Sequence, residues 1–390
     1  MNLRLLTTAA AIAVFTLAGC SKTDSGDKPA GEAATIKIGQ IASMTGKEAT
    51  FGQQVDDGIK LAIEEINKAG GLLGKKVELI TEDTQSQTPP TKTAMEKLVS
   101  KDQVVAVIGE VASSRSMAAA PIAERGKVTL LSPASTNSNV TLDKDGKTLN
   151  YVYRICFIDP FQGTVMAKFA SENLKAKNIA VLKDNANDYS VGLAKNFTET
   201  FTKNGGTIVE EQAYEGGQTD FKAQLTAIKA KNPEAIFVPG YYTEVSLIAQ
   251  QARELGIKAP LLGGDGWDSP VLTQGAAKQA LEGSFFSNHY SEQDTSAVVL
   301  EFIKRYTAKY NEVPGAMSAL GYDAMNIIAK VIKDAGKADA ETIAKGLATL
   351  KDYPGVTGKI TIDAQHNANK PAVVLQIKDG KYSYYSTIAP

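Results

Sequence analysis

The chain has 390 residues, of which 43% are hydrophobic and 22% charged, so it is long enough for two globular domains and too apolar for a disordered protein. Its 42 Lys and Arg residues balance 43 Asp and Glu residues, which leaves no positive excess for binding nucleic acid. Two cysteines and two histidines are too few for a disulfide framework or for a Cys-rich or His-based metal site, so we expect no metal and no cofactor.

The first residues have the composition of a secretory signal. Arg4 precedes an apolar run at 5–17 that is too short to span a bilayer. Leu17-Ala18-Gly19-Cys20 resembles the lipobox of bacterial lipoproteins, in which Cys20 would carry the lipid; an ordinary signal with an incidental Cys is the alternative. We therefore predict a lipoprotein signal peptide at 1–19, a flexible polar tether at 20–35, and a membrane-anchored protein in the periplasm or at the cell surface.

From residue 36 onward, short apolar strands alternate with amphipathic helices, first in one series and then, from about residue 151, in a second. The first series has predicted strands at 36–41, 76–80, 104–108 and 128–131 and helices at 53–69, 90–100 and 114–125. The second has strands at 179–182, 207–211, 235–238 and 261–263 and helices at 161–175, 191–203, 221–230 and 244–255. This alternation predicts two doubly wound, Rossmann-like α/β lobes with mostly parallel sheets.

Three later helices, at 297–310, 316–335 and 340–350, have no matching strands and are expected to pack on the first sheet. Short strands at 356–362, 373–377 and 382–385 complete the chain. The chain would then cross between lobes near 156–160, 287–291 and 366–372. The predicted first lobe is 36–157 with 289–371, and the predicted second lobe is 158–288 with 372–390.

Polar groups follow three of the predicted strands, and ligands of open α/β sheets bind at the carboxyl ends of strands. Ser113 lies near the start of the helix after strand 104–108, Thr136 belongs to the turn after strand 128–131, and Asp265 follows strand 261–263. Turns rich in hydrogen-bond donors on one lobe would fit the carboxylate of a zwitterion, and the single carboxylate on the other lobe would fit its ammonium group. Taken singly, each residue could equally be an ordinary cap or turn residue.

Motifs for catalysis are missing from the sequence. It contains no HExxH, GxSxG, Ser-x-x-Lys or Walker A motif, and 264–269 only partly matches a dinucleotide-binding fingerprint. Cys156 beside a predicted strand is more typical of a small buried hydrophobe than of a nucleophile. We therefore predict that the protein is not an enzyme.

Seven short segments resemble, in this order, the branched-chain amino acid-binding proteins of ABC importers. They are IKIG at 36–39, MTG at 44–46, FG at 51–52, EINKAGG at 65–71, SPAST at 132–136, DPFQG at 159–163 and DYSVG at 188–192. The resemblance extends from about residue 36 to the C-terminus. It implies a two-lobed type I periplasmic binding protein that closes about a multi-strand hinge on its ligand, an α-amino acid with a branched-chain or other aliphatic side chain. It also implies permease subunits in the membrane as partners and a monomeric chain.

The resemblance further implies roles for polar residues. Ser113, Ala134 and Thr136 match residues that hold the α-carboxylate and α-ammonium of the ligand. Asp265 stands where the family often has a Glu that pairs with the ammonium, and it is one methylene shorter.

Aromatic residues complete the expected cleft. Phe51, Tyr189 and Tyr241 match positions that line it, although Phe51 replaces a common Tyr, and Trp267 adds bulk beside the site. These departures leave the preferred amino acid open. Two other functions also remain open: a ligand-sensing module for a signalling partner, and a nucleotide-dependent enzyme, for which the first strand-to-helix turn at 44–47 lacks a phosphate-binding pattern.

Overall fold

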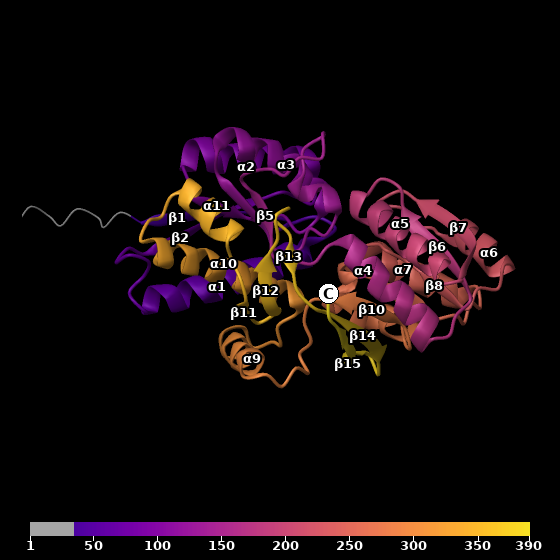
Figure 1. Ribbon diagram of the computed structural model, residues 1–390. Coiled ribbons are helices and arrows are strands. Elements are labelled where there is room, and N and C mark those ends of the chain that lie inside the picture. The colour runs from indigo at the N-terminus through magenta and orange to yellow at the C-terminus, as the bar shows by residue number, and fades with distance from the viewer. Residues whose placement is uncertain (1–34) are drawn as a thin grey trace, which may run out of the picture. The chain divides into compact units, whose positions relative to one another are not determined.

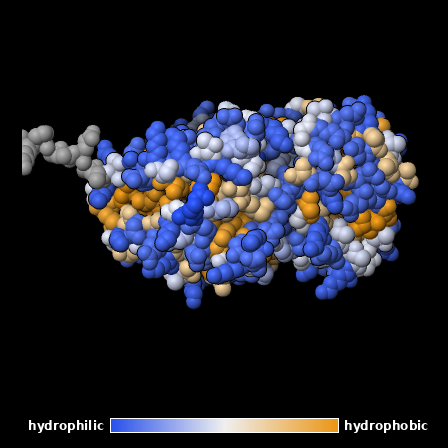
Figure 2. All heavy atoms as spheres, turned by 90° about the horizontal axis from the view of Figure 1, so that it is seen from above, coloured by the Kyte–Doolittle hydropathy of each residue, from blue (hydrophilic) through white to orange (hydrophobic). Residues whose placement is uncertain are grey.

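The computed structural model describes residues 35–390. The predicted signal peptide, the lipidation site Cys20 and all but the last residue of the predicted tether lie outside this range. Among the described residues, no helix is long and apolar enough to cross a membrane. In a space-filling view, hydrophilic side chains cover most of the face shown and hydrophobic residues form separate patches (Figure 2).

The first sheet has five parallel strands in the order β2-β1-β3-β4-β5. The strands are β1 (Ile36–Ala42), β2 (Val77–Asp83), β3 (Ala106–Ile108), β4 (Thr129–Ser132) and β5 (Val152–Arg154). The helices packed around it are α1 (Ala49–Lys68), α2 (Thr88–Lys97), α3 (Ser113–Gly126), α10 (Ala316–Ala335) and α11 (Ala340–Ala348), as Figure 1 shows. Side chains alternate between its faces: Ala106 and Ile108 join the larger core, whereas Val107 joins a separate cluster with residues of α2 and α3.

The second sheet has seven strands in the order β15-β14-β10-β9-β8-β6-β7. The strands are β6 (Asn178–Asp184), β7 (Thr207–Tyr214), β8 (Ala235–Phe237), β9 (Leu261–Gly263), β10 (Phe285–Asn288), β14 (Ala372–Lys378) and β15 (Lys381–Ile388). The helices of this part are α4 (Asp159–Lys168), α5 (Asp188–Lys203), α6 (Lys222–Ala230), α7 (Tyr242–Glu254) and α8 (Gly275–Ala280). The pairs β10/β14 and β14/β15 are antiparallel and the others parallel.

Several features differ from the sequence expectations. Helix α8 and strand β10 are not predicted, because six and four residues are too few to show a periodicity. Irregular turns of π-helix at Leu98–Asp102 and Phe169–Asn173 continue α2 and α4.

The single strand predicted at 356–362 is instead a hairpin. It is formed by β11 (Tyr353–Gly355) and β12 (Gly358–Ile362), which join β13 (Ala368–Asn369) in a small third sheet. The buried carboxylate of Asp323 on α10 accepts hydrogen bonds from the turn, from Val356 N at 2.8 Å and Thr357 N at 2.9 Å. This contact comes from a distant helix, so the local pattern of the hairpin does not reveal it.

The chain passes between the two large sheets three times: after β5, between β10 and α9 (Ala297–Tyr310), and between β13 and β14. Helices α10 and α11 return to the first sheet, against β3 and β4 (Figure 1). The predicted architecture of two α/β lobes with parallel sheets is confirmed. The exact residues at which one lobe ends and the other begins stay a prediction.

Helices α1 and α10 approach each other so closely that only glycine fits at their contact. A Cβ on Gly58 would lie 2.0 Å from the Ser318 carbonyl oxygen, and one on Gly321 would lie 2.3 Å from the Val55 carbonyl oxygen. Backbone atoms cannot yield as a flexible side chain can, so the helices would have to separate.

We therefore expect Gly58→Ala to lower the free energy of unfolding by about 1–3 kcal/mol, although alanine is the better helix former. Chemical denaturation measures this loss. Lys333→Ala, at an exposed position of α10, is the matched control and should leave stability nearly unchanged. Equal stability of Gly58→Ala and the parent would contradict the close helix contact.

Candidate functional site

A small cavity of about 10 Å³ lies between the two sheets. Its walls are Phe51, Val111, Ser113, Ala134, Tyr189, Tyr241, Asp265, Gly266 and Met317. Most of these residues follow the carboxyl ends of strands β3, β4, β6, β8 and β9. The strand-end argument thus leads to the place where both lobes contribute to one enclosed space.

The first lobe presents the N-terminus of α3 to this cavity. Ser113 is the first residue of the helix, and its hydroxyl accepts a hydrogen bond from Asn137 N at 3.1 Å. The two preceding amides, of Val111 and Ala112, donate to the Glu110 carboxylate at 2.8 and 3.0 Å. The next N–H groups, at the start of the helix, remain available, and the helix dipole makes this end attractive to an anion.

The turn after β4 supplies the adjoining wall. Ala134 lines the cavity, whereas Thr136 is fully buried beside it and is not part of the lining. The Thr136 hydroxyl lies beside the buried Asp159 carboxyl and interacts with it. The structure therefore brings Ser113 and Ala134 to the cavity surface and leaves Thr136 behind it.

The second lobe contributes Asp265, and it is not the isolated carboxylate that the sequence argument assumed. Gln162 Nε2 donates to Oδ1 at 2.8 Å, and His289 Nε2 lies 3.0 Å from Oδ2. Burial lowers the pKa of His289, so its imidazole is neutral at pH 7 and donates its Nε2 proton to the carboxylate. Each carboxylate oxygen retains a free acceptor position, so Asp265 is oriented toward the cavity and still able to accept a donor.

A second carboxylate, missed from the sequence, lies in the same region. Asp159 is buried, and burial raises its pKa to about 8; the Thr136 hydroxyl opposes this rise and the charge of Asp265 adds to it. It is therefore mostly protonated at pH 7. Asp159 and Gln162 belong to a quoted segment, DPFQG, and His289 is one of two histidines, but nothing local connects them to Asp265.

Aromatic rings close the cavity from both lobes. Tyr189 and Tyr241 stack with ring centroids 5.2 Å apart, and Phe51 of the first lobe meets Tyr241 edge-on at 5.7 Å. The Tyr189 hydroxyl accepts from Gly266 N at 3.1 Å. All three aromatic residues expected at the cleft line it.

Trp267 differs from the expectation, because the structure does not bring it into the cavity lining. Its indole is fully buried, donates Nε1–H to the Val238 carbonyl at 3.0 Å and packs against Gly263 and Phe286 in the second lobe. The glycine at 263 leaves the space that the indole fills. Sequence proximity to Asp265 suggested a place beside the ligand, but the short helical turn at Asp265–Trp267 turns the ring into the core.

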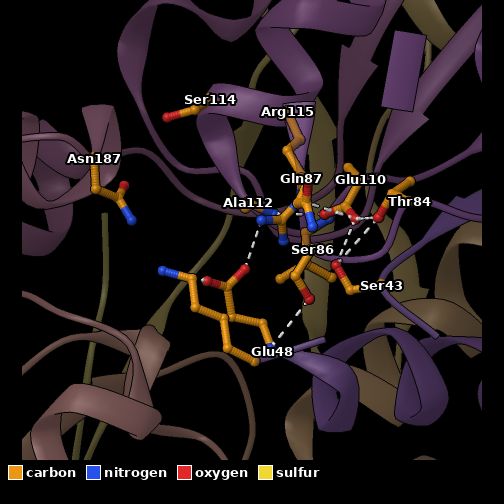
Figure 3. Close-up of polar contacts among 12 residues, drawn as sticks. Ser43, Glu48, Thr84, Ser86, Gln87, Glu110, Ala112, Ser114, Arg115 and Asn187 are labelled. Atoms are coloured by element: carbon orange, nitrogen blue, oxygen red, sulfur yellow. Dashed lines mark hydrogen bonds and ion pairs between the residues drawn. The ribbon is translucent and has the colours of Figure 1, made fainter. Parts of the chain in front are cut away.

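A buried charge cluster lies next to the start of α3 (Figure 3). The Arg115 guanidinium lies between two carboxylates, with Nη1 2.6 Å from Glu48 and Nε 3.1 Å from Glu110. Burial opposes its charge, but the two carboxylates raise the pKa of Arg115, which therefore stays protonated. Ser43 and Thr84 hydroxyls also donate to Glu110, at 2.8 and 2.6 Å.

Direct contacts join the two lobes around the cavity. Asn137 Nδ2 donates to the Asp188 carbonyl at 2.7 Å, and Asp188 N donates to the Ser114 hydroxyl at 3.2 Å. On the other side, the Thr243 hydroxyl donates to the Lys47 carbonyl at 2.6 Å. The two lobes are therefore in direct contact in this structure.

Comparison with known proteins agrees with this architecture. Residues 35–381 match the protein family described as Periplasmic binding protein. The chain is 32% identical over 329 residues to the Leu/Ile/Val-binding protein BraC3 of Rhizobium johnstonii, covering 84% of this chain and 87% of that one.

Solved structures show the same arrangement. The leucine binding protein LivK of Thermotoga maritima is 40% identical, with a TM-score of 0.86 over 91% of this chain and 99% of its own. The branched-chain amino acid transporter substrate binding protein LivJ of Streptococcus pneumoniae, in complex with isoleucine, is 36% identical, with a TM-score of 0.86 over 92% and 100% of the two chains. With a family match along most of its length and this two-lobed frame, the chain belongs to the periplasmic binding protein family.

Proposed function

We propose that this protein is the substrate-binding subunit of an ABC importer and binds a free α-amino acid with a branched aliphatic side chain in the cavity between its lobes. The observation that supports this most directly is the polarity of the cavity. One wall offers Ser113 and the start of α3, and the opposite wall offers the Asp265 carboxylate. As a member of its family, the chain is a binding protein and not an enzyme.

In this proposal the two charges of the ligand are held by different lobes. The α-carboxylate is bound by the N-terminal amides of α3 and the Ser113 hydroxyl, and the α-ammonium by Asp265 and the Ala134 carbonyl. Asp159 is mostly protonated and His289 neutral at pH 7, which leaves Asp265 as the charged partner of the ammonium. Each pole of the ligand is thus complemented by an opposite charge or dipole.

The remaining walls favour an aliphatic side chain. Phe51, Val111, Tyr241 and Met317 surround the rest of the cavity, and no Lys or Arg is among its lining residues. Buried apolar contact of this kind stabilises a Leu, Ile or Val side chain by about 1.5–3 kcal/mol. The isoleucine bound to the Streptococcus pneumoniae relative supports the same ligand class.

Binding of the ligand between two lobes would also connect binding to transport. A ligand held by both lobes favours the closed arrangement, and we propose that permease subunits in the membrane recognise this closed form. Lipidation at Cys20 would keep the monomeric binding protein beside them through the tether, provided that it adds more than one acyl chain, which stable attachment requires.

Asp265→Asn should weaken isoleucine binding by about ten- to a hundredfold, because a charge-assisted hydrogen bond is worth about 1.5–3 kcal/mol. Ser113→Ala should also weaken binding, since it removes a hydroxyl from the opposite wall, and Thr136→Val should weaken it less, since that hydroxyl lies behind the wall. Calorimetric titration measures all three.

Two further variants control this experiment. Asp379→Asn removes a carboxylate at an exposed position of the same lobe and should bind as the parent does. Asp265→Glu restores the charge and should retain most of the affinity. Unchanged binding in a folded Asp265→Asn would place the ammonium partner elsewhere.

Isoleucine should also shift the lobes from an open ensemble toward the closed one. Small-angle X-ray scattering should give a smaller radius of gyration in the presence of saturating isoleucine. Asp265→Asn at the same concentration serves as the control, because its site stays mostly empty. An identical radius in both states at saturation would count against a closing cleft.

Lipidation is tested separately. Cys20→Ala should abolish labelling by radioactive palmitate and release the protein from the membrane fraction or leave its signal uncleaved. Persistent labelling and membrane fractionation of this variant would rule out the lipobox interpretation. Isoleucine binding by the purified variant should stay at the parent value, since Cys20 precedes the folded lobes.

A further inference from the structure

A second and larger cavity, of about 300 Å³, lies between the lobes beside the amino-acid site. The first lobe contributes Gln54 and Asp57 of α1, the second contributes Asp268, and Tyr290 and Glu292 lie on the crossing segment between β10 and α9. The two cavities are neighbours along the chain, because Phe51 lines the smaller one while Gln54 lines the larger. The function proposed above makes no use of this space.

The charge of the second cavity is strongly one-sided. Four carboxylates line it, those of Asp57, Asp268, Glu292 and Glu312, and no Lys or Arg is among its lining residues. Within residues 35–390, none of the four is in an ion pair. Burial raises the pKa values of Asp57 and Asp268 to about 6, and for Asp57 the charges of Asp56 and Glu312 add to the rise. Lys60 and Lys309 near Asp57 and Lys381 near Glu292 compensate part of this negative charge, but none of these lysines is among the lining residues.

Polar atoms without partners lie in the same cavity. Tyr290 is 5% exposed, and its hydroxyl has no hydrogen-bond partner among the described residues. Burial raises the pKa of Tyr290, the charges of Glu292 and Asp268 add to the rise, and all three residues line the cavity. The Gln54 Oε1 atom is also buried without a partner. An unpaired buried polar group is costly, and a ligand with N–H donors would satisfy both atoms.

The shape of the cavity selects among cations. The described residues contain no group of three or more His, Cys, Asp or Glu that could hold a metal ion, so the carboxylates are too dispersed for a metal centre. Apolar surface from Val313, Pro314 and Leu375 lies between the charged groups. Dispersed carboxylates with apolar surface between them match an alkyl chain that ends in ammonium groups.

We propose that this cavity is a second binding site, which takes an aliphatic primary amine with one or two ammonium groups. Asp268 holds the inner ammonium: it is 3% exposed, and its carboxylate already accepts hydrogen bonds from the Ala316 amide at 2.7 Å, from the Met317 amide and from Asn288, which fix its position. Tyr290 and Gln54 accept further N–H groups beside it. Asp57, Glu292 and Glu312 at the more exposed side hold the outer end.

Calorimetric titration of the full chain with 1,4-diaminobutane tests the proposal, with and without saturating isoleucine. We expect one amine per chain in both titrations, and no binding of 1,4-butanediol, which has the same length without charge. Absence of amine binding at millimolar concentration, equal binding of the diol, or competition by isoleucine would each overturn the second site. Because the titration without isoleucine stands alone, its result does not depend on the proposed amino-acid function.

Substitutions of the lining carboxylates test whether the amine binds in this cavity. The double variant Asp57→Asn/Glu292→Gln should weaken diaminobutane binding by about tenfold or more, since two charge-assisted contacts are lost. Asp145→Asn/Glu215→Gln removes two exposed carboxylates that do not line the cavity and should bind as the parent does. Equal weakening by both double variants would show only a general effect of charge and would contradict the site.

Tyr290→Phe tests the site with a variant that has the same charge as the parent protein. The lost hydroxyl has no protein partner, so the melting temperature should stay the same, while diaminobutane binding weakens by about two- to tenfold. Unaltered amine affinity in this variant would remove Tyr290 from the site, and together with an unaltered Asp57→Asn/Glu292→Gln it would overturn the proposal.

Discussion

The buried carboxylate of Glu110 is the constraint on which the candidate site depends. It accepts the amides of Val111 and Ala112 and the hydroxyls of Ser43 and Thr84, and it faces the Arg115 guanidinium (Figure 3). Loss of one partner from such a group leaves an uncompensated buried charge, which costs several kcal/mol, about 3–5 by analogy with buried ion pairs. The loop before α3 is thereby fixed, and with it the direction in which the helix presents its free amides to the cavity.

A weak ion pair connects the same charge cluster to the second lobe. Lys47 lies 3.5 Å from both Glu48 on its own lobe and Glu244 on the other, and its side chain is 38% exposed. Exposed ion pairs contribute about 0–1 kcal/mol, so this bridge alone cannot hold the lobes together. The edge-on contact of Phe51 with Tyr242, at 4.9 Å, is more apolar and more buried. A closed form held by modest contacts suits a binding protein, because the ligand's own binding energy can then decide between open and closed.

The sequence was sufficient to predict those positions that general rules of the fold determine. Alternating periodicity predicts the strands and helices, and the strand-end rule leads to Ser113 and Asp265 without any knowledge of the lobes' packing. It could not show that Gln162 and His289 orient Asp265, because 103 and 24 residues separate these partners from it. It also misplaced Trp267, whose direction is set by one helical turn and by the space above Gly263. Partners brought together by the tertiary fold have no local signal.

The two interlobe cavities share their walls, and this couples what each can bind. In α1, Phe51 lines the smaller cavity and Gln54 the larger, and at the start of α10 Met317 lines the smaller while Ala316 and Ser318 line the larger. Gly58 and Gly321 allow these two helices to pack in backbone contact, so α1 and α10 form one closely packed unit of the first lobe. An occupant of either cavity contacts that unit and the second lobe together, so each one favours the same closed arrangement. By thermodynamic linkage, an amine in the larger cavity and an amino acid in the smaller one must then strengthen each other's binding by the same factor.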